Sequence, residues 1–265
     1  MEKEKITLTG VSETVFVPVY ARALESKKPN HIFYDEAAVR AVDTLDYDFS
    51  KHGQSKMNMW GCAARTEIFD RFTAKHIKKY PDCTVVNLAC GLDDRFHRVD
   101  NGQIHWINLD FASIIELRKK LIQENDRVTD LACSVFDYSW MDQVENKDHV
   151  LILAEGFLMY PEQEQVKELF DMVAERFTNT ELLLELMTKW MVDHQKMHDT
   201  TKKTDVSFRF GVEKTADFCK ICPQYMYTGE YNFTDGMKQF SPFFMTLIAP
   251  VLRGKNNRMG RFVQK

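Results

Sequence analysis

The stretch TVVNLACGLDDRFHR, residues Thr84–Arg98, decides the fold of this chain. Its first residues, Thr84–Ala89, are β-branched or apolar, which is typical of a buried strand. The run ends in a polar turn at Gly91, and a second strand-like run, Ile104–Leu109, ends on Asp110. An acidic residue about 20 positions beyond a glycine turn, at the end of the second strand of a βαβ unit, is typical of sites for nucleotide-like ligands. The glycine lets the backbone approach the ligand and the carboxylate accepts the ribose hydroxyls, so this pair predicts an adenosine-bearing cofactor.

Strand-like runs alternate with helical patterns beyond this pair. A helix is expected where Ile114, Leu117 and Leu121 recur at helical spacing, and another begins at Pro161. The βαβαβ rhythm predicts an α/β fold in which a mostly parallel sheet carries helices on both faces, and two neighbouring strands at the end of the chain favour an antiparallel edge. The later strands are expected at Leu131–Val135, Val150–Ala154, Glu181–Met187, Met226–Phe233 and Arg258–Gln264.

The segments outside this alternation are predicted to be helical. Pro18–Ser26 and Asp35–Val42 are candidate helices within residues 1–60, and a third helix ends at Pro81. Residues 187–207 interrupt the alternation and are expected to form a helical insertion after the fifth strand. No linker separates a second unit, so we expect one domain over residues 1–265, with the N-terminal helices and the insertion covering the ligand pocket.

Composition excludes several classes of partner. The 265 residues include 44% hydrophobic residues, enough for a large core, and the formal net charge is −4. No block of lysine or arginine stands out, which argues against nucleic acid as a partner. The beginning MEKEKITLTG has no apolar signal segment and no run is long enough for a membrane span, so a cytoplasmic protein without membrane contact is expected.

The six cysteines are expected to be reduced thiols. Two of them, Cys219 and Cys222, form a CxxC pair. One pair alone does not complete a tetrahedral zinc site, which favours ordinary packing over metal or redox use. We therefore predict no metal.

Two acidic residues each allow two interpretations from the residues alone. Asp110 precedes the helical run FASIIELRKKL, so it suits a helix N-cap as well as a ribose. Glu155 follows a fully apolar strand directly, where a charge needs a partner. That partner is either a cationic group of a ligand or a salt bridge to a neighbouring helix. The turn holds one glycine, with Ala89 where a two-glycine loop has its first, which argues against a dinucleotide.

Several ordered motifs together resemble the leucine carboxyl methyltransferase family, which includes protein phosphatase methyltransferases and bacterial polyketide O-methyltransferases. The motifs are NLACGLDDRFHR, INLDFASIIELRKKL, SVFDYSW and LAEGFLMYPEQEQVKELF, with VPVYARALESKKP and AARTEIFD ahead of them matching the bacterial branch. The resemblance extends from about Val17 to Phe177 and more loosely to the end. It implies the class I methyltransferase (Rossmann-like) fold with a seven-stranded sheet and the cofactor S-adenosylmethionine.

The resemblance also implies roles for individual residues. Arg65 is similar to the arginine that binds the methionine carboxylate, a grip that suits the planar guanidinium; the alternative is a surface charge near a helix start. Gly91 passes under the methionine portion, Asp110 holds the ribose and Glu155 contacts the cofactor. Ser134 and Val135 fall at an Asp-Leu pair beside the adenine. The serine puts the usual contact to the adenine amine in doubt, and Asp137 is a possible substitute.

The resemblance implies transfer of a methyl group to an oxygen of a small molecule, and we favour a carboxylate over a hydroxyl acceptor. A carboxylate is already ionised near neutral pH and needs placement rather than a base, which explains why no nucleophile–base set is evident. His194 and His198 are expected on a helix surface rather than in catalysis, so no catalytic side chain is predicted. Tyr160 is a candidate for orienting the acceptor, with packing as the alternative.

Two other functions remain as alternatives. A nicotinamide-dependent oxidoreductase is disfavoured by the single glycine and by the position of the YxxxK sequence, Tyr47–Lys51, ahead of the first strand. A relative that binds the cofactor without transferring a methyl group is kept open by Ser134 and Ala89, because a fold does not guarantee a function.

Overall fold

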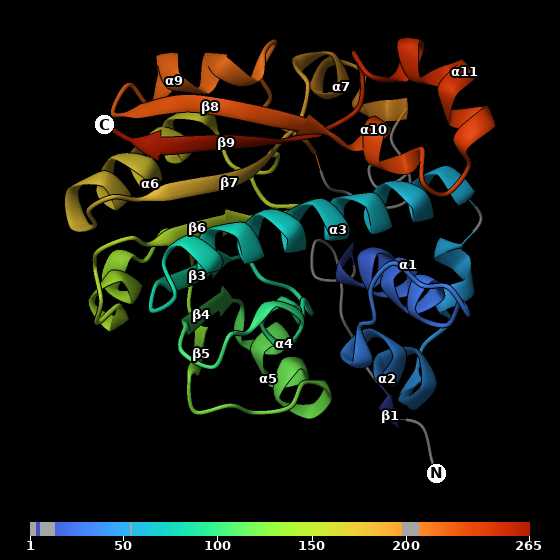
Figure 1. Cartoon of the computed structure of the whole chain (residues 1–265), viewed down its shortest axis with the longest axis horizontal. Helices are drawn as coiled ribbons and strands as arrows, with labels where there is room; N and C mark the ends of the chain where they lie inside the picture. The colour runs from blue at the N-terminus through green and yellow to red at the C-terminus, as the bar shows by residue number, and fades with distance from the viewer. Residues whose placement is uncertain (1–3, 6–13, 54, 198–206) are drawn as a thin grey trace.

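A seven-stranded sheet forms the centre of the computed structural model, which describes residues 4–5, 14–53, 55–197 and 207–265 (Figure 1). The strand order is β5-β4-β3-β6-β7-β9-β8, parallel from β5 to β7, with β9 antiparallel to both its neighbours. The predicted sheet and its antiparallel edge are therefore confirmed. The strands are β3 (Thr84–Leu88), β4 (His105–Asp110), β5 (Val128–Ala132), β6 (Leu151–Ala154), β7 (Glu181–Leu186), β8 (Tyr225–Asn232) and β9 (Arg258–Gln264).

Helices cover both faces of this sheet because its central strands are apolar on both sides. Along β3, Val85 packs into one buried cluster and Val86 into another, as the two-residue period of a strand requires. The first face lies under α3 (Lys56–Lys79), α4 (Arg95–Val99) and α10 (Phe233–Met237). The second face lies under α6 (Gln163–Arg176), α9 (Phe218–Ile221) and the 3₁₀ helix η3 (Tyr138–Gln143).

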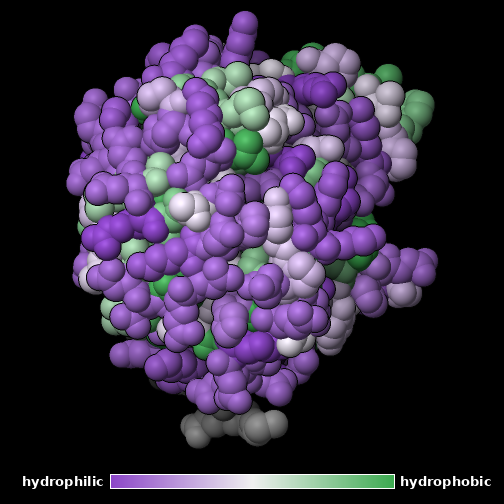
Figure 2. Space-filling model, turned by 60° about the vertical axis from the view of Figure 1, so that its left-hand side comes forward, coloured by the Kyte–Doolittle hydropathy of each residue, from purple (hydrophilic) through white to green (hydrophobic). Residues whose placement is uncertain are grey.

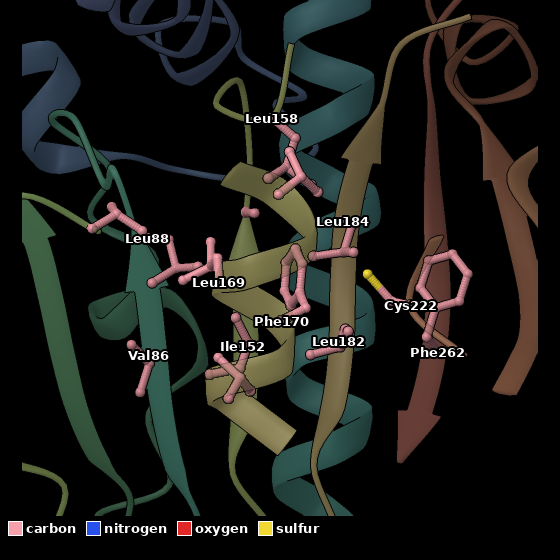
Figure 3. Close-up of a cluster of buried hydrophobic side chains, with 14 of the residues drawn as sticks. Val86, Leu88, Ile152, Leu158, Leu169, Phe170, Leu182, Leu184, Cys222 and Phe262 are labelled. Carbon is pink, nitrogen blue, oxygen red and sulfur yellow. The ribbon is translucent and has the colours of Figure 1, made fainter. Parts of the chain in front are cut away.

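Figure 3 shows the second face, where Leu169 and Phe170 of α6 lie against side chains of the sheet. Cys222 packs in the same cluster beside Phe262 and is completely buried. Cys219 and Cys222 are both free thiols. The packing role favoured for this pair agrees with the position of Cys222 in the core.

The N-terminal helices form a layer of their own. Helices α1 (Phe16–Ser26) and α2 (Glu36–Thr44) pack with the 3₁₀ helix η2 (Phe49–His52) and with α5 (Ala112–Leu121). Asp35 is fully buried at the start of α2, and its Oδ1 accepts a hydrogen bond of 2.8 Å from the backbone N–H of Ala38. A two-stranded parallel pair, β1 (Glu4–Lys5) and β2 (Leu45–Asp46), completes this layer.

One predicted strand boundary is wrong for an identifiable reason, and one helix begins earlier than its apolar pattern indicates. The strand expected at Leu131–Val135 is β5, which lies three positions earlier. β5 is an edge strand and only half buried, so polar residues such as Thr129 and Asp130 fit within it and the apolar signal is weak. Helix α3 begins at Lys56, well before its strongest apolar residues, because the side chain of Ser55 accepts from the N–H of Asn58 and caps it.

The insertion after β7 is only partly helical in the described residues. It contains α7 (Lys189–Asp193) and the 3₁₀ helix η4 (Gln195–Met197). Residues 198–206, which include His198, lie outside the described part of the chain. Thr188 caps α7 by accepting from the N–H of Met191.

The surface in Figure 2 is mostly hydrophilic, with hydrophobic residues gathered toward its upper right edge. Helix α11 (Pro242–Leu252) carries several exposed apolar side chains, among them Phe243, Phe244, Leu247 and Val251. Within the described residues, none of the helices combines the length and the apolar character that crossing a bilayer requires.

Candidate active site

A cavity of about 630 Å³ lies where the parallel strands end. The strand order reverses between β3 and β6, and in open α/β sheets ligands bind outside the carboxyl ends of the strands at such a point. All the site residues predicted from the sequence line this one cavity. They are Arg65, Gly91, Asp110, Ser134, Val135, Glu155 and Tyr160.

Gly91 and Asp110 are joined by a hydrogen bond. The backbone N–H of Gly91 donates to Asp110 Oδ2 over 2.8 Å, and the N–H of Phe111 donates to Oδ1 over 2.7 Å. Phe111, not Asp110, is the N-cap of α5, so the alternative of a helix-capping Asp110 is wrong. Burial raises the pKa of Asp110, and its effect exceeds that of the two hydrogen bonds, which lower it. Each carboxylate oxygen keeps a lone pair free for a hydroxyl donor.

The turn that holds these groups requires an unusual backbone. Gly91 has φ +54°, and a Cβ there would approach Val15 Cγ2 to 2.9 Å. Ala89 also lies in the left-handed region, with φ 49°. A glycine adopts this conformation without strain, whereas an alanine does not. Position 89, where a two-glycine loop has its first glycine, is therefore one that favours glycine for a backbone reason.

Arg65 reaches the cavity from the middle of α3 and lies between two glutamates. Its Nη1 donates to Glu185 Oε2 over 2.9 Å, and its Nε lies 2.7 Å from Glu155 Oε1. The Nε is buried and, among the described residues, has no acceptor aligned for a hydrogen bond. The side chain is 15% exposed. The alternative of a surface charge is therefore wrong, and a guanidinium edge is available at the cavity.

Glu155 is held by a second arginine that the sequence analysis did not select. Arg95 Nη2 donates to Glu155 Oε2 over 2.6 Å, and its Nε and Nη1 pair with Asp70 and Asp93. Burial opposes ionisation of Glu155, but the arginines Arg65 and Arg95 outweigh it and lower its pKa. Burial likewise opposes ionisation of Asp93, but the charges of Arg95 and Arg98 outweigh it and lower the pKa of Asp93.

These pairs extend into a buried ionic network that ties the N-terminal layer to the site. Arg98 pairs with Asp70, with Asp93 and with Asp35, and Asp35 also pairs with Arg22 of α1. Burying one of these charges without its partner is costly, so the network fixes the relative position of its elements. The sequence signal for this network is the run DDRFHR, Asp93–Arg98, whose charges follow an apolar strand after a short turn.

Glu185 is the other residue that the sequence analysis missed. It lies near the end of β7, is almost fully buried and lines the cavity. Its Oε2 accepts from the N–H of Gly156 over 2.7 Å, and its Oε1 accepts from Asn257 Nδ2 over 2.8 Å. Glu155 was selected because it is a charge next to an apolar run. Glu185 carries the same kind of signal, a charge within the apolar run ELLLEL, and it was overlooked.

The turn after β5 places Ser134 and Val135 at the cavity but turns Asp137 away. Ser134 Oγ accepts from the N–H of Phe136 over 3.2 Å. Asp137 caps η3 by accepting from the N–H of Ser139 and does not line the cavity. Asp137 is thus occupied with its own helix and does not take the place of the usual aspartate in this structure.

Tyr160 and the insertion close the other end of the cavity. Tyr160 is hydrogen bonded to Thr14, and burial raises its pKa. Met187 and Met191 of the insertion and Phe208, which directly follows it, also line the cavity. His194 does not, because its Nδ1 lies 2.9 Å from the carbonyl oxygen of Trp190 and its ring stacks on the Trp190 indole.

Residues 16–174 match the leucine carboxyl methyltransferase family. The chain belongs to this family. It is 28% identical over 241 residues to the tetracenomycin polyketide synthesis O-methyltransferase TcmP of Streptomyces glaucescens, covering 91% of this chain and 87% of the relative. It is 27% identical over 199 residues to the S-adenosyl-L-methionine-dependent methyltransferase dpfgK of Gibberella zeae, covering 68% and 66%.

Solved structures show the fold. A candidate methyltransferase from Thermobifida fusca has a TM-score of 0.64 at 9% identity, over 97% of this chain and 95% of that chain. The magnesium protoporphyrin IX methyltransferase ChlM from Synechocystis PCC 6803, crystallised with S-adenosylmethionine, has a TM-score of 0.51 at 10% identity, over 89% and 100%. The class I methyltransferase fold predicted from the sequence is therefore confirmed. The family match, not the structural likeness, shows that the oxidoreductase alternative is wrong.

The cavity of this family member fits the cofactor in three respects. Gly91 forms a turn that a Cβ would obstruct, Asp110 keeps free acceptor capacity, and Arg65 has a buried donor without an aligned acceptor. Its volume also lies within the roughly 300–1,000 Å³ of small-molecule sites. The residues present are thus compatible with an adenosine group joined to an amino acid.

Proposed function

We propose that this protein is an O-methyltransferase that transfers the methyl group of S-adenosylmethionine to a carboxylate of a small molecule. Methyl transfer from S-adenosylmethionine follows from the family, and the carboxylate acceptor is the finer part of the proposal. One observation carries it: every residue predicted for the cofactor and acceptor lines the same cavity, although these residues come from segments between Arg65 and Tyr160.

The proposed roles divide among the elements that end at the cavity. Arg65 holds the methionine carboxylate with its guanidinium, and Glu155 lies on the same side and attracts the ammonium. Asp110 accepts the ribose hydroxyls, and Gly91 keeps the backbone close beneath the ligand. Val135 and Ser134 lie beside the adenine, where the serine hydroxyl is a weaker acceptor than the usual carboxylate.

When bound, the cofactor supplies a methyl group activated by a sulfonium. An acceptor carboxylate forms a C–O bond to that methyl as the S–C bond breaks, and the sulfur keeps the electron pair. No proton moves, because the carboxylate is ionised at neutral pH. The protein therefore contributes placement and exclusion of water. Tyr160, whose pKa is raised by burial, stays protonated and is available as a hydrogen-bond donor rather than a base.

A product analysis tests the acceptor class. The protein is incubated with methyl-labelled S-adenosylmethionine and a library of aromatic carboxylic acids with their matched phenols. We expect a methyl ester, which releases labelled methanol in mild alkali, from acids only. The rate should stay flat from about pH 6 to 8, and His194→Ala should remain within a few-fold of the parent, against a loss of roughly 100-fold for a true base.

The opposite pattern would overturn the carboxylate acceptor. An alkali-stable product formed from phenols, with a rate that rises through a histidine-like pKa, requires a general base and a hydroxyl acceptor. A collapse of turnover in His194→Ala would identify that base. This result would not affect the family assignment or the cofactor. It would contradict only the proposal that the acceptor is a carboxylate.

A further inference from the structure

The cavity has a second half that the cofactor roles leave unassigned. Its lining comes from the start of α3, the segment after β6, the insertion, α10 and the segment around α11. We call its sulfur-bearing surface the methionine wall, defined by Met57, Met159, Met187, Met191 and Met237. These residues belong to two small apolar clusters, separate from the cores that hold the sheet.

The methionine wall indicates the chemical character of the ligand that this half of the cavity suits. Methionine is unbranched and polarizable, so such a surface adapts to large apolar groups and makes favourable contacts with aromatic rings. Phe208 packs with Met159 and Met187, and its ring lies 5.9 Å from that of Tyr160. This half of the cavity therefore suits a bulky apolar or aromatic body rather than a small polar molecule.

One lysine distinguishes this surface from an ordinary apolar pocket. Lys255 lines the cavity just beyond α11, and its Nζ lies over the Trp190 ring, 4.5 Å from the centroid. Among the described residues it makes no ion pair with a carboxylate. The other cations of the cavity lining, Arg22 and Arg65, are both paired with acidic side chains. Lys255 is thus the cation left available for an anionic ligand.

The backbone around Lys255 is fixed, so the lysine is positioned rather than loose. Its carbonyl oxygen accepts from Thr188 Oγ1 over 3.0 Å, which joins the segment to the start of the insertion. Its N–H donates to the carbonyl of Leu252, another residue of the cavity lining. Two residues further on, Asn257 donates to Glu185. The segment therefore connects the methionine wall to the proposed cofactor side.

We propose that Lys255 is the specificity-determining residue that binds the carboxylate of the acceptor while the methionine wall holds its apolar body. This rests on the proposed function and names the acceptor class as an apolar aromatic acid. A carboxylate has two oxygens, so one pairs with the ammonium and the other remains free to take the methyl group. Lys255 and the wall thereby select for an acid over the equivalent uncharged molecule.

Fluorescent probes test this without knowledge of the natural acceptor. 1-Anilinonaphthalene-8-sulfonate is an apolar aromatic anion, and N-phenyl-1-naphthylamine is its uncharged counterpart. Both are titrated into protein saturated with S-adenosylhomocysteine. We expect Lys255→Met to weaken binding of the anion about tenfold and to leave the neutral probe unchanged, because a hydrogen bond to a charged group is lost. Lys255→Arg should retain most of the anion affinity.

Two controls assign the probe to this surface. Lys238→Met removes a lysine of similar exposure that pairs with Asp235 and lies outside the cavity lining, and it should change neither probe. Phe243→Ser alters the exposed face of α11 and should also leave the anion bound. Loss of the anion in Phe243→Ser, with full binding in Lys255→Met, would place the probe on α11 and overturn the proposal.

The remaining outcomes are equally decisive. Equal loss of both probes in Lys255→Met would show a packing role and contradict anion recognition, as would failure of the parent to bind the anion. Calorimetry of the same samples with S-adenosylhomocysteine separates the two proposals. Absent cofactor binding refutes the proposed function, whereas normal cofactor binding with a charge-insensitive Lys255→Met refutes only the role of Lys255.

Discussion

At the scale of single residues, the backbone at the edge of the cavity adopts a strained conformation. Ala89 carries this strain, because its φ of 49° lies where an L side chain is strained by roughly 1–2 kcal/mol. Gly91, two residues on, has a similar φ and pays no such cost. The turn at this edge of the cavity is therefore held in place by its neighbours against a local strain at Ala89.

Replacing Ala89 by glycine should relieve this strain. We expect Ala89→Gly to raise the free energy of unfolding by roughly 0.5–1 kcal/mol, since the gain in the turn exceeds the added flexibility of the unfolded chain. Thermal melts should show a rise of roughly 1–3 °C. Ala132→Gly is the matched control, because Ala132 lies in β5 without a positive φ and should destabilise instead. Equal destabilisation by both substitutions would contradict strain at Ala89.

The residue scale is also where the sequence predicted most. Gly91, Asp110 and Glu155 stand at strand ends, and a strand end is visible in the sequence as the point where an apolar run meets a polar residue. Arg95 and Glu185 were missed although each has a local signal, a charge close to or within an apolar run. That signal indicates a charge that needs a partner but does not identify the partner, because Glu155 and Arg65 lie far along the chain from Arg95 and Glu185.

At the scale of elements, charged residues join the helices to the sheet. Glu181 begins β7, where its Oε2 lies 2.9 Å from His76 Nδ1 of α3 and its Oε1 accepts from Arg261 Nη2 of β9. Burial opposes ionisation of Glu181, but the hydrogen bonds from His76 and Arg261 outweigh it and lower its pKa. One carboxylate therefore connects three elements.

The pH dependence of stability follows from this lowered pKa. Because the folded-state pKa of Glu181 lies below its unfolded value, its contribution is fully present above the unfolded pKa, near 4.5, and is lost as the pH falls through the folded pKa. Glu181→Gln should therefore lower the denaturation midpoint at pH 7, with the gap to the parent narrowing below about pH 4. Urea unfolding at several pH values measures this gap. Glu116→Gln, at an exposed position of α5, is the control, and a gap that is independent of pH would exclude the linkage.

Element boundaries show the limit of sequence patterns. Buried strands such as β6, which is apolar throughout, were found to within one residue. β5 was misplaced by three positions because an edge strand need not be apolar. The insertion after β7 is less helical than expected in its described part, since its residues line the cavity and pack as individual side chains.

At the scale of the whole molecule, the cavity exists only because segments far apart in the sequence meet at the carboxyl ends of the parallel strands. Residues of α1 and α3 line one side of the cavity, and the ends of the parallel strands form its floor. The insertion, α10 and the segment after α11 line the rest. The sequence predicted the floor from its strand pattern. It predicted the cover only in outline, because which side chains of a cover face inward depends on tertiary packing.

The claim on which the others depend is that this cavity binds S-adenosylmethionine through the residues at the strand ends, and calorimetric titration tests it most directly. S-adenosylhomocysteine, which avoids turnover, is titrated into the parent, Arg65→Ala and Arg71→Ala, and NADH into the parent. Arg71 is an exposed residue of the same helix that pairs with Glu67. Both glutamates beside Arg65 keep other partners, so Arg65→Ala should remain folded.

The predicted result is one site for S-adenosylhomocysteine in the parent and in Arg71→Ala, with affinity lower by about 100-fold in Arg65→Ala, as expected for the loss of a charge-assisted pair. NADH should give no heat of binding. Binding of NADH by a parent that leaves S-adenosylhomocysteine unbound below millimolar concentration would contradict the account, and an unchanged affinity in a folded Arg65→Ala would remove the cofactor from the site described.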